Sequence, residues 1–120
     1  MDSYRAKAEA VRMAEVYRKE FAIAECPSDV ESPTVLAAQA ANELLDISGI
    51  KASFVLTIYE GKIYMSARSI DEVNVQVVAE KLGGGGHINA AGAQFDHTDM
   101  EEAIKALKQT IDKMIEEGDI

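Results

Sequence analysis

Four consecutive glycines followed by a histidine are the segment of this sequence with the clearest chemical potential. The run covers residues 83–86, and His87 follows it directly. Without a Cβ in the way, successive N–H groups of Gly84, Gly85 and Gly86 could converge on phosphate oxygens. The His87 imidazole could donate to the same phosphate, stack on a base or transfer a proton. A flexible loop is the other interpretation, and the adjacent histidine favours an anion site.

A second candidate is Arg68, which lies in the sequence Ser66-Ala67-Arg68-Ser69. A planar guanidinium can make two parallel hydrogen bonds to phosphate, and the hydroxyls of Ser66 and Ser69 could add further donors. Most arginines instead form ion pairs at the surface, so that role is the alternative. If this segment ends beside the glycines, Arg68 and His87 would face one anion from two sides.

The charge balance limits what such a site can bind. The 120 residues include 12 Lys and Arg against 21 Asp and Glu, a net charge of −9. This charge argues against binding of extended nucleic acid through a broad basic surface. Residues 62–94 contain three basic and three acidic residues, so a phosphate would meet little repulsion there. We therefore expect a local anion site.

Two further groups of reactive side chains are better explained by structure than by chemistry. The segment 96–99 resembles a metal-ligand cluster, but Thr98 and Glu101 have the spacing of a helix capping box. Polar residues gather at helix starts for that reason alone. Cys26 is the only cysteine, so it cannot form an internal disulfide, and we expect it to pack in the core. No metal site is predicted in this chain.

The periodicity of apolar residues predicts the elements that position these groups. The first half begins with a helix over residues 4–20 and a strand over 21–26. Ser32 suits an N-cap and Pro33 the first helical position, so a second helix should begin there. Gly49 is the expected C-terminal cap of that helix.

A β-hairpin should follow, with strands at 52–59 and 63–68 joined by a tight turn at residues 60–61. Residues 73–82 fit either a strand or a helix. We choose the helix because Asn74 is a good N-cap and the glycines would end it abruptly.

The last part of the chain should contain a single turn at 87–91, a strand at 93–95 and a final helix. That helix begins at the Thr98 capping box and ends at Gly118. Helices alternating with strands and a hairpin predict an α/β fold, in which helices cover a mixed β-sheet with an antiparallel hairpin.

Residues 83–92, Gly-Gly-Gly-Gly-His-Ile-Asn-Ala-Ala-Gly, resemble the GGGH-x-x-AAG signature of the DHH-associated domain, the C-terminal lobe of DHH phosphoesterases. The Arg68 segment and residues 73–82 look most like the membrane-anchored cyclic-di-AMP phosphodiesterases of bacteria. The glycine in Ala91-Gly92-Ala93 keeps the nanoRNase branch, which acts on short oligonucleotides, as an alternative. A purely structural module is a third class. The absence of Trp and of a basic track favours the cyclic dinucleotide.

The resemblance implies that this chain binds substrate and contains no catalytic residue. The residues it assigns to phosphate or nucleoside are Ser66, Arg68, Ser69, Gly84, Gly85, Gly86, His87 and Asn89. Two Mn²⁺ ions would be held by a DHH domain preceding this segment of the same polypeptide. Residues 1–20 would be the linker helix and 21–120 the associated domain. The expected setting is a cytoplasmic domain of a protein anchored in the bacterial membrane, with a homodimer as a further expectation.

Overall fold

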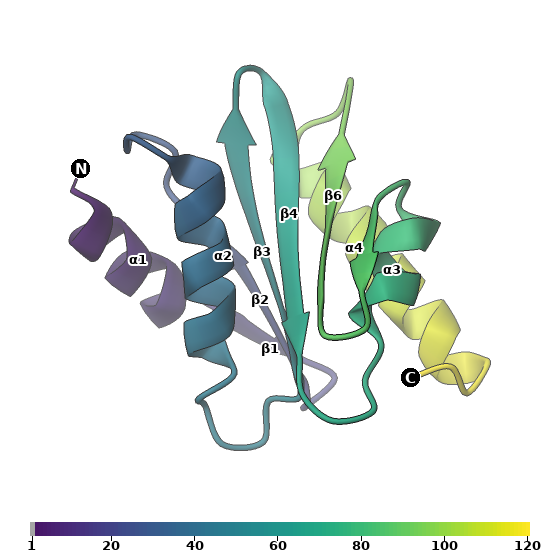
Figure 1. Ribbon diagram of the computed structural model, residues 1–120. Coiled ribbons are helices and arrows are strands. Elements are labelled where there is room, and N and C mark those ends of the chain that lie inside the picture. Colours follow the sequence, from purple (N-terminus) through teal and green to yellow (C-terminus); the bar gives the residue numbers. More distant parts are fainter. Residues whose placement is uncertain (1) are drawn as a thin grey trace.

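Residues 2–120 are described by the computed structural model, and they form a six-stranded sheet with helices on both faces (Figure 1). The strand order is β1-β2-β3-β4-β6-β5. Strands β2 and β3 are parallel and every other neighbouring pair is antiparallel, which confirms the predicted mixed sheet. The strands are β1 (Glu15–Tyr17), β2 (Phe21–Glu25), β3 (Ala52–Tyr59), β4 (Lys62–Ser69), β5 (Gly85–His87) and β6 (Ala90–Phe95).

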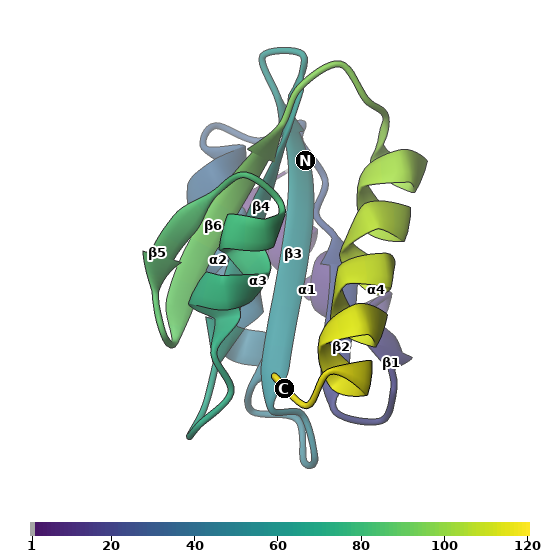
Figure 2. The same cartoon turned by 90° about the vertical axis from the view of Figure 1, so that its right-hand side faces the viewer.

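The sheet separates two core layers, each covered by a pair of helices. Helices α1 (Ser3–Arg12) and α2 (Pro33–Leu44) pack on one face around Leu36, Leu44 and Val55. Helices α3 (Val75–Lys81) and α4 (Met100–Glu116) pack on the other face around Phe54 and Leu107. Figure 2 shows α4 running along the sheet, with β5 at its outer edge. Burial of both faces of β2 and β3 fixes these strands as the centre of the fold.

Helices α3 and α4 are bounded by capping residues, most of them predicted from the sequence. Asn74 caps α3 as predicted, since its side chain accepts from the amides of Gln76 and Val77. The cap of α4 lies one residue later than predicted, because the carboxylate of Asp99, and not the Thr98 hydroxyl, accepts from the amide of Glu102. Helix α4 ends at Glu116, and Gly118, the glycine predicted to end it, follows the C-cap residue Glu117 with a φ of 76°.

The predicted first helix is wrong beyond Arg12. Residues Glu15–Tyr17 form β1, and Arg18 and Lys19 turn the chain with φ of 53° and 69°. Pairing of β1 with β2 and a hydrogen bond from Tyr17 to Asp112 of α4 overcome the helical pattern. Assignment of residues 1–20 to a linker stays a prediction, although α1 and β1 pack on the same fold.

Two further boundaries differ from the sequence analysis. Helix α2 ends at Leu44, so Gly49, with φ of 89°, belongs to the following loop and is not its cap. The hairpin of β3 and β4 agrees with the prediction, since Glu60 and Gly61 both have the positive φ of a tight turn. None of the helices formed by residues 2–120 is long and apolar enough to cross a membrane.

The glycine segment contains the largest correction. Residues Gly85–His87 form an edge strand, and β6 begins at Ala90, so residues 88–89 are a hairpin turn and not a helical turn. Helix α3 packs against both strands of this hairpin from one side. Gly85 and Gly86 thus belong to a strand at the edge of the sheet.

Candidate functional site

The helices formed by residues 2–120 leave part of one face of the sheet uncovered. Helix α2 packs on β3 and β4, whereas the helix that packs against β5 and β6 is α3, on the opposite face. The α2-side surface of β6 and β5, with the adjoining part of β4 beside α2, therefore has no helix over it, and we call it the open face (Figure 1). A surface of this kind can receive a ligand without displacing core residues.

Strand register places Arg68 and His87 on the open face in one row. Arg68 pairs with Ala90, and Ala90 pairs with His87 on the next strand. Directly paired residues of antiparallel strands point to the same side. On its other side Arg68 pairs with Ser53, whose hydroxyl donates to the Ala41 carbonyl of α2, so the whole row faces the α2 side. Two strand spacings separate the backbones of Arg68 and His87 by about 10 Å.

The adjacent row forms a floor of small residues. Ser66 pairs with Gly92, and Gly92 pairs with Gly85. Together with Ala90, these residues leave a low surface between the arginine and the histidine. The open face thus brings together four of the predicted residues: Ser66, Arg68, Gly85 and His87.

Three of the four glycines are explained by the fold. Gly83 ends α3 with φ of 89°. A Cβ on Gly84 would lie 2.0 Å from the carbonyl oxygen of Gly92, and one on Gly86 would lie 2.5 Å from Cα of Ala91. These contacts are with backbone, so the strands could not pair as closely with larger residues. Gly85 differs, because a Cβ there would meet nothing within 4 Å. Its missing side chain leaves space on the open face.

The sequence predicts that the N–H groups of Gly84, Gly85 and Gly86 converge on an anion. This prediction is wrong for Gly84, because its amide is already bonded within the protein. The amides of Gly83 and Gly84 donate to the carbonyls of Glu80, at 3.1 Å, and Ala79, at 2.7 Å, at the end of α3. Residues 85–87 are extended and pair with β6. The glycine segment therefore offers a flat strand with room above it, not a cup of N–H groups.

Arg68 does not have the surface ion pair that was its alternative role. Its Nη1 donates to the carbonyl of Ala67 at 2.8 Å and approaches that of Ala91 at 3.5 Å. None of the salt bridges within residues 2–120 includes Arg68. The side chain is half-buried, so its charge is placed at the open face without a neutralising carboxylate. Such a cation is suited to an anionic ligand.

Ser69 and Asn89, also predicted for the site, lie elsewhere. Ser69 is the next residue of β4 and points to the opposite face, where it is 6% exposed. Its hydroxyl donates to the Val73 carbonyl at 2.6 Å, and the Asn89 amide donates to the Ser69 oxygen at 2.9 Å. These bonds join the end of β4, the segment before α3 and the hairpin turn. Both side chains are thus used in holding the hairpin that carries His87.

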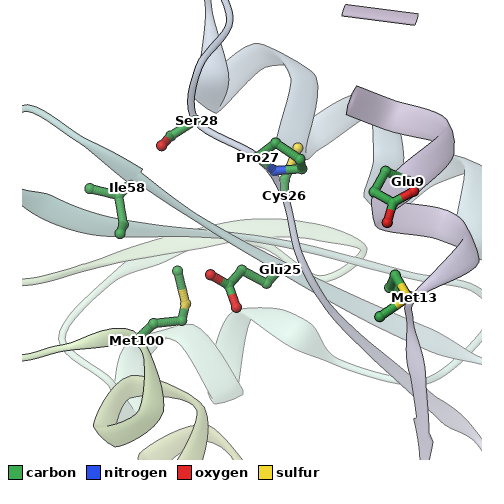
Figure 3. A pocket seen from close by; sticks show the side chains of 8 residues that line it. All are labelled: Glu9, Met13, Glu25, Cys26, Pro27, Ser28, Ile58 and Met100. Carbon is green, nitrogen blue, oxygen red and sulfur yellow. The ribbon is translucent and has the colours of Figure 1, made fainter. Parts of the chain in front are cut away.

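A cavity of about 290 Å³ opens at a different part of the molecule (Figure 3). Its lining includes Glu9 of α1, Glu25 of β2 and Met100 of α4, and none of the predicted site residues. Cys26 also borders it, and burial raises the pKa of this thiol, which keeps it neutral. The side chain is 2% exposed, as expected for a core cysteine.

Within residues 2–120, no three His, Cys, Asp or Glu side chains are arranged to hold a metal ion. Asp99 of the 96–99 segment caps α4, in place of the predicted Thr98. The residues described do not fit a Mn²⁺ pair.

The family follows from the match of most of this fold to a known domain. Residues 19–116 match the DHHA1 domain. The chain belongs to the DHHA1 domain family. This confirms the resemblance carried by residues 83–92. The DHHA1 domain described here is similar to regions of two cyclic-di-AMP phosphodiesterases, PdeA and GdpP.

The similarity to these relatives is high over a limited part of their length. PdeA of Listeria monocytogenes is 46% identical over 103 residues, which are 85% of this chain and 16% of PdeA. GdpP of Bacillus subtilis is 40% identical over 121 residues, covering 98% of this chain and 18% of GdpP. The chain thus spans less than a fifth of either relative.

Solved structures share the fold. An exopolyphosphatase-related protein from Bacteroides fragilis has a TM-score of 0.84 at 25% identity, covering 93% of this chain and 34% of that one. RecJ from Thermus thermophilus, crystallised with Mn²⁺, has a TM-score of 0.65 at 19% identity, covering 91% of this chain and 16% of RecJ. RecJ supports the fold alone.

Proposed function

We propose that this DHHA1 domain supplies a substrate-binding surface of a cyclic-di-AMP phosphodiesterase, with the open face as the site. The observation that carries the proposal is the row of Arg68, Ala90 and His87 beside the space above Gly85. A cation and an imidazole separated by a low floor can hold a phosphate from two sides. Ser66 adds a hydroxyl in the adjacent row.

The substrate is inferred from similarity and charge together. Both relatives described above are cyclic-di-AMP phosphodiesterases. The open face has one arginine and one histidine, a compact pair that suits a small dinucleotide better than a long chain of phosphates. A short oligonucleotide is the alternative substrate, and a purely structural module is the alternative class.

Hydrolysis in this proposal requires the rest of the polypeptide. A DHH domain preceding this segment would hold two Mn²⁺ ions, and these ions would supply the Lewis-acid chemistry for phosphodiester cleavage. The present chain would bind and orient the nucleotide against that domain. Anchoring of the parent in a bacterial membrane and formation of a homodimer belong to the same proposal.

The test is nuclear magnetic resonance titration of the 120-residue chain with cyclic-di-AMP, its linear dinucleotide and a short oligoribonucleotide. We expect amide shifts confined to β4, β5 and β6 at the open face, largest for one of the two dinucleotides. Shifts elsewhere, or none at all, would contradict the proposal. A stronger response to the oligoribonucleotide would favour the alternative substrate.

A matched pair of histidine variants gives the control. His87 and His97 are both exposed, and His97 lies outside the open face. His97 has a φ of 57°, which asparagine tolerates, so both are changed to Asn. His87→Asn should weaken dinucleotide binding by about tenfold, the effect of losing one charge-assisted hydrogen bond. His97→Asn should leave binding unchanged.

A further inference from the structure

The open face continues beyond the row of Arg68, Ala90 and His87, which we call the phosphate row, to two residues that the proposed function does not use. Tyr64 of β4 and Gln94 of β6 are directly paired, two residues from Ser66 and Gly92 along their strands. Because side chains alternate along a strand, both point to the same face as Ser66 and Arg68. Tyr64 is half-buried and Gln94 is exposed.

The ring of Tyr64 is held by a neighbouring aromatic residue. Its centroid lies 6.0 Å from that of Tyr59, with an angle of 63° between the ring planes. This is an edge-to-face contact, so Tyr59 supports the position of Tyr64 without stacking flat on it. A planar ligand could stack on the Tyr64 ring.

The amide of Gln94 has a defined orientation. Its Nε2 donates to Oδ1 of Asp96 at 2.8 Å, and Nζ of Lys62 lies 4.0 Å from the same oxygen. The carboxylate accepts but cannot donate, so it fixes which end of the amide is nitrogen. One Nε2–H and the Oε1 acceptor of Gln94 have no partner within residues 2–120.

An amide side chain, with a donor beside an acceptor, can recognise adenine specifically. Adenine presents the N7 acceptor next to the N6 amino donor, and a glutamine amide can bond to both. Guanine presents two acceptors, N7 and O6, at the corresponding positions, so the Gln94 oxygen would face another acceptor. The pair thus has the chemistry to distinguish the two purines.

We propose that Tyr64 and Gln94 form an adenine-specific base site, in which the base stacks on Tyr64 and its N6–H and N7 bond to Gln94. This inference rests on the proposed function, because it takes the ligand to be a dinucleotide whose phosphate lies at Arg68. Tyr64 and Arg68 are four positions apart on β4, about 14 Å at the strand rise. The base site is therefore distinct from the phosphate row and suits the far adenine of a two-nucleotide ligand.

The experiment compares cyclic-di-AMP with cyclic-di-GMP on the 120-residue chain, with dissociation constants from amide shifts. The unmodified protein should prefer cyclic-di-AMP by about ten- to a hundredfold, the discrimination given by one bidentate amide contact. Gln94→Ala should weaken cyclic-di-AMP binding by a similar factor and leave cyclic-di-GMP binding nearly unchanged, so the preference disappears. The control is Gln109→Ala, an exposed glutamine of α4 on the opposite face.

Tyr64 is tested by a graded pair. Tyr64→Phe should keep the affinity for cyclic-di-AMP, because the ring remains, whereas Tyr64→Ala should lower it by about tenfold through lost stacking. A thermal melt of each variant separates loss of the base site from loss of the fold. Equal affinities for the two ligands in the unmodified protein, or a preference that survives Gln94→Ala, would overturn the inference.

The two proposals fail in different ways. If Arg68→Ala abolishes binding while Gln94→Ala leaves the base preference intact, the base site is wrong and the phosphate site stands. If neither cyclic dinucleotide binds the unmodified chain, both proposals are overturned.

Discussion

Arg68 and His87 lie on the same face of the sheet and are separated by one residue, Ala90, on the strand between them. They are 19 positions apart in the sequence, with α3 and the glycine segment in between. The crossover through α3 returns the chain to the sheet beyond β6, which puts His87 on the edge strand. The spacing of the two side chains is therefore fixed by strand pairing, which is more rigid than a loop.

Replacement of Arg68 tests the cationic end of this row. Arg68→Ala should weaken cyclic-di-AMP binding by about ten- to a hundredfold, since a charged hydrogen bond contributes roughly 1.5 to 3 kcal/mol. Arg68→Lys should restore only part of the affinity, because an ammonium cannot make the paired contact. Calorimetric titration measures both. Arg5→Ala, at an arginine of α1, is the control, and an equal loss there would argue for a nonspecific charge effect.

The glycines of β5 give a prediction that separates folding from binding. Gly85→Ala should fold normally, with stability equal to or about 0.5 to 1 kcal/mol above the unmodified protein, because its Cβ meets open space and alanine is less flexible. Ligand affinity should still fall, since the methyl group occupies the floor of the open face. Gly84→Ala should lower the free energy of unfolding by about 3 kcal/mol or more, as expected for severe overpacking.

Urea unfolding and dinucleotide titration of both variants check this prediction. Retained binding in Gly85→Ala would mean that the ligand does not approach this strand. An equal loss of stability in the two variants would contradict the difference in space between Gly84 and Gly85.

Tyr17 predicts a pH dependence of stability. Its hydroxyl donates to Asp112 at 2.7 Å, and this bond, followed by burial, raises the pKa of Tyr17 above 10. A raised pKa in the folded state means that the folded protein holds the proton more tightly than the unfolded chain. The stabilisation is complete below pH 10 and is lost as the pH rises through the higher, folded-state pKa.

Tyr17→Phe is the direct test. It should lower the free energy of unfolding at pH 8 by about 0.5 to 1.5 kcal/mol, the usual contribution of one hydrogen bond. The alkaline decline in stability should become shallower in this variant, as measured by urea titrations from pH 8 to 11. Tyr4→Phe, at a tyrosine 80% exposed on α1, should change neither quantity. An unchanged alkaline slope in Tyr17→Phe would exclude the Asp112 bond as its cause.

The sequence predicts those elements whose local signals agree with their packing. Asn74 caps α3, and residues 60–61 turn the β3–β4 hairpin, because the residue types required there have few alternatives. Local pattern fails where distant pairing decides. Residues 15–17 continue a helical pattern, yet they gain a partner strand, and Tyr17 gains Asp112, 95 positions away.

The same distinction applies to the candidate site. Residues 83–86 and His87 stand out in the sequence as glycine and imidazole, but only the register with β6 shows that Gly85 faces open space while Gly84 faces backbone. Alternation along β4 could have separated Ser69 from Ser66 and Arg68, since odd and even positions of a strand face opposite sides. It could also have drawn attention to Tyr64. The pairing of Tyr64 with Gln94 needed the fold.

The bond between Asn89 and Ser69 predicts a coupled effect on stability and binding. Asn89 donates to the Ser69 oxygen at 2.9 Å and to the Asp71 carbonyl at 3.3 Å, which holds the hairpin turn against the segment before α3. Asn89→Ala should lower the free energy of unfolding by about 1 to 2 kcal/mol through these lost bonds. Ser69→Ala should cost a similar amount, because the buried hydroxyl also donates to Val73.

A double-mutant cycle measures the link between the two side chains. The variant with both changes should lose less stability than the sum of the single variants, since each removes the same bond. Asn42→Ala, at an exposed asparagine of α2, should be additive with Ser69→Ala. Dinucleotide affinity of Asn89→Ala should fall only modestly, because its side chain positions the hairpin and lies off the open face. A loss as large as that of Arg68→Ala, in a variant that melts normally, would instead place Asn89 in direct contact with the ligand.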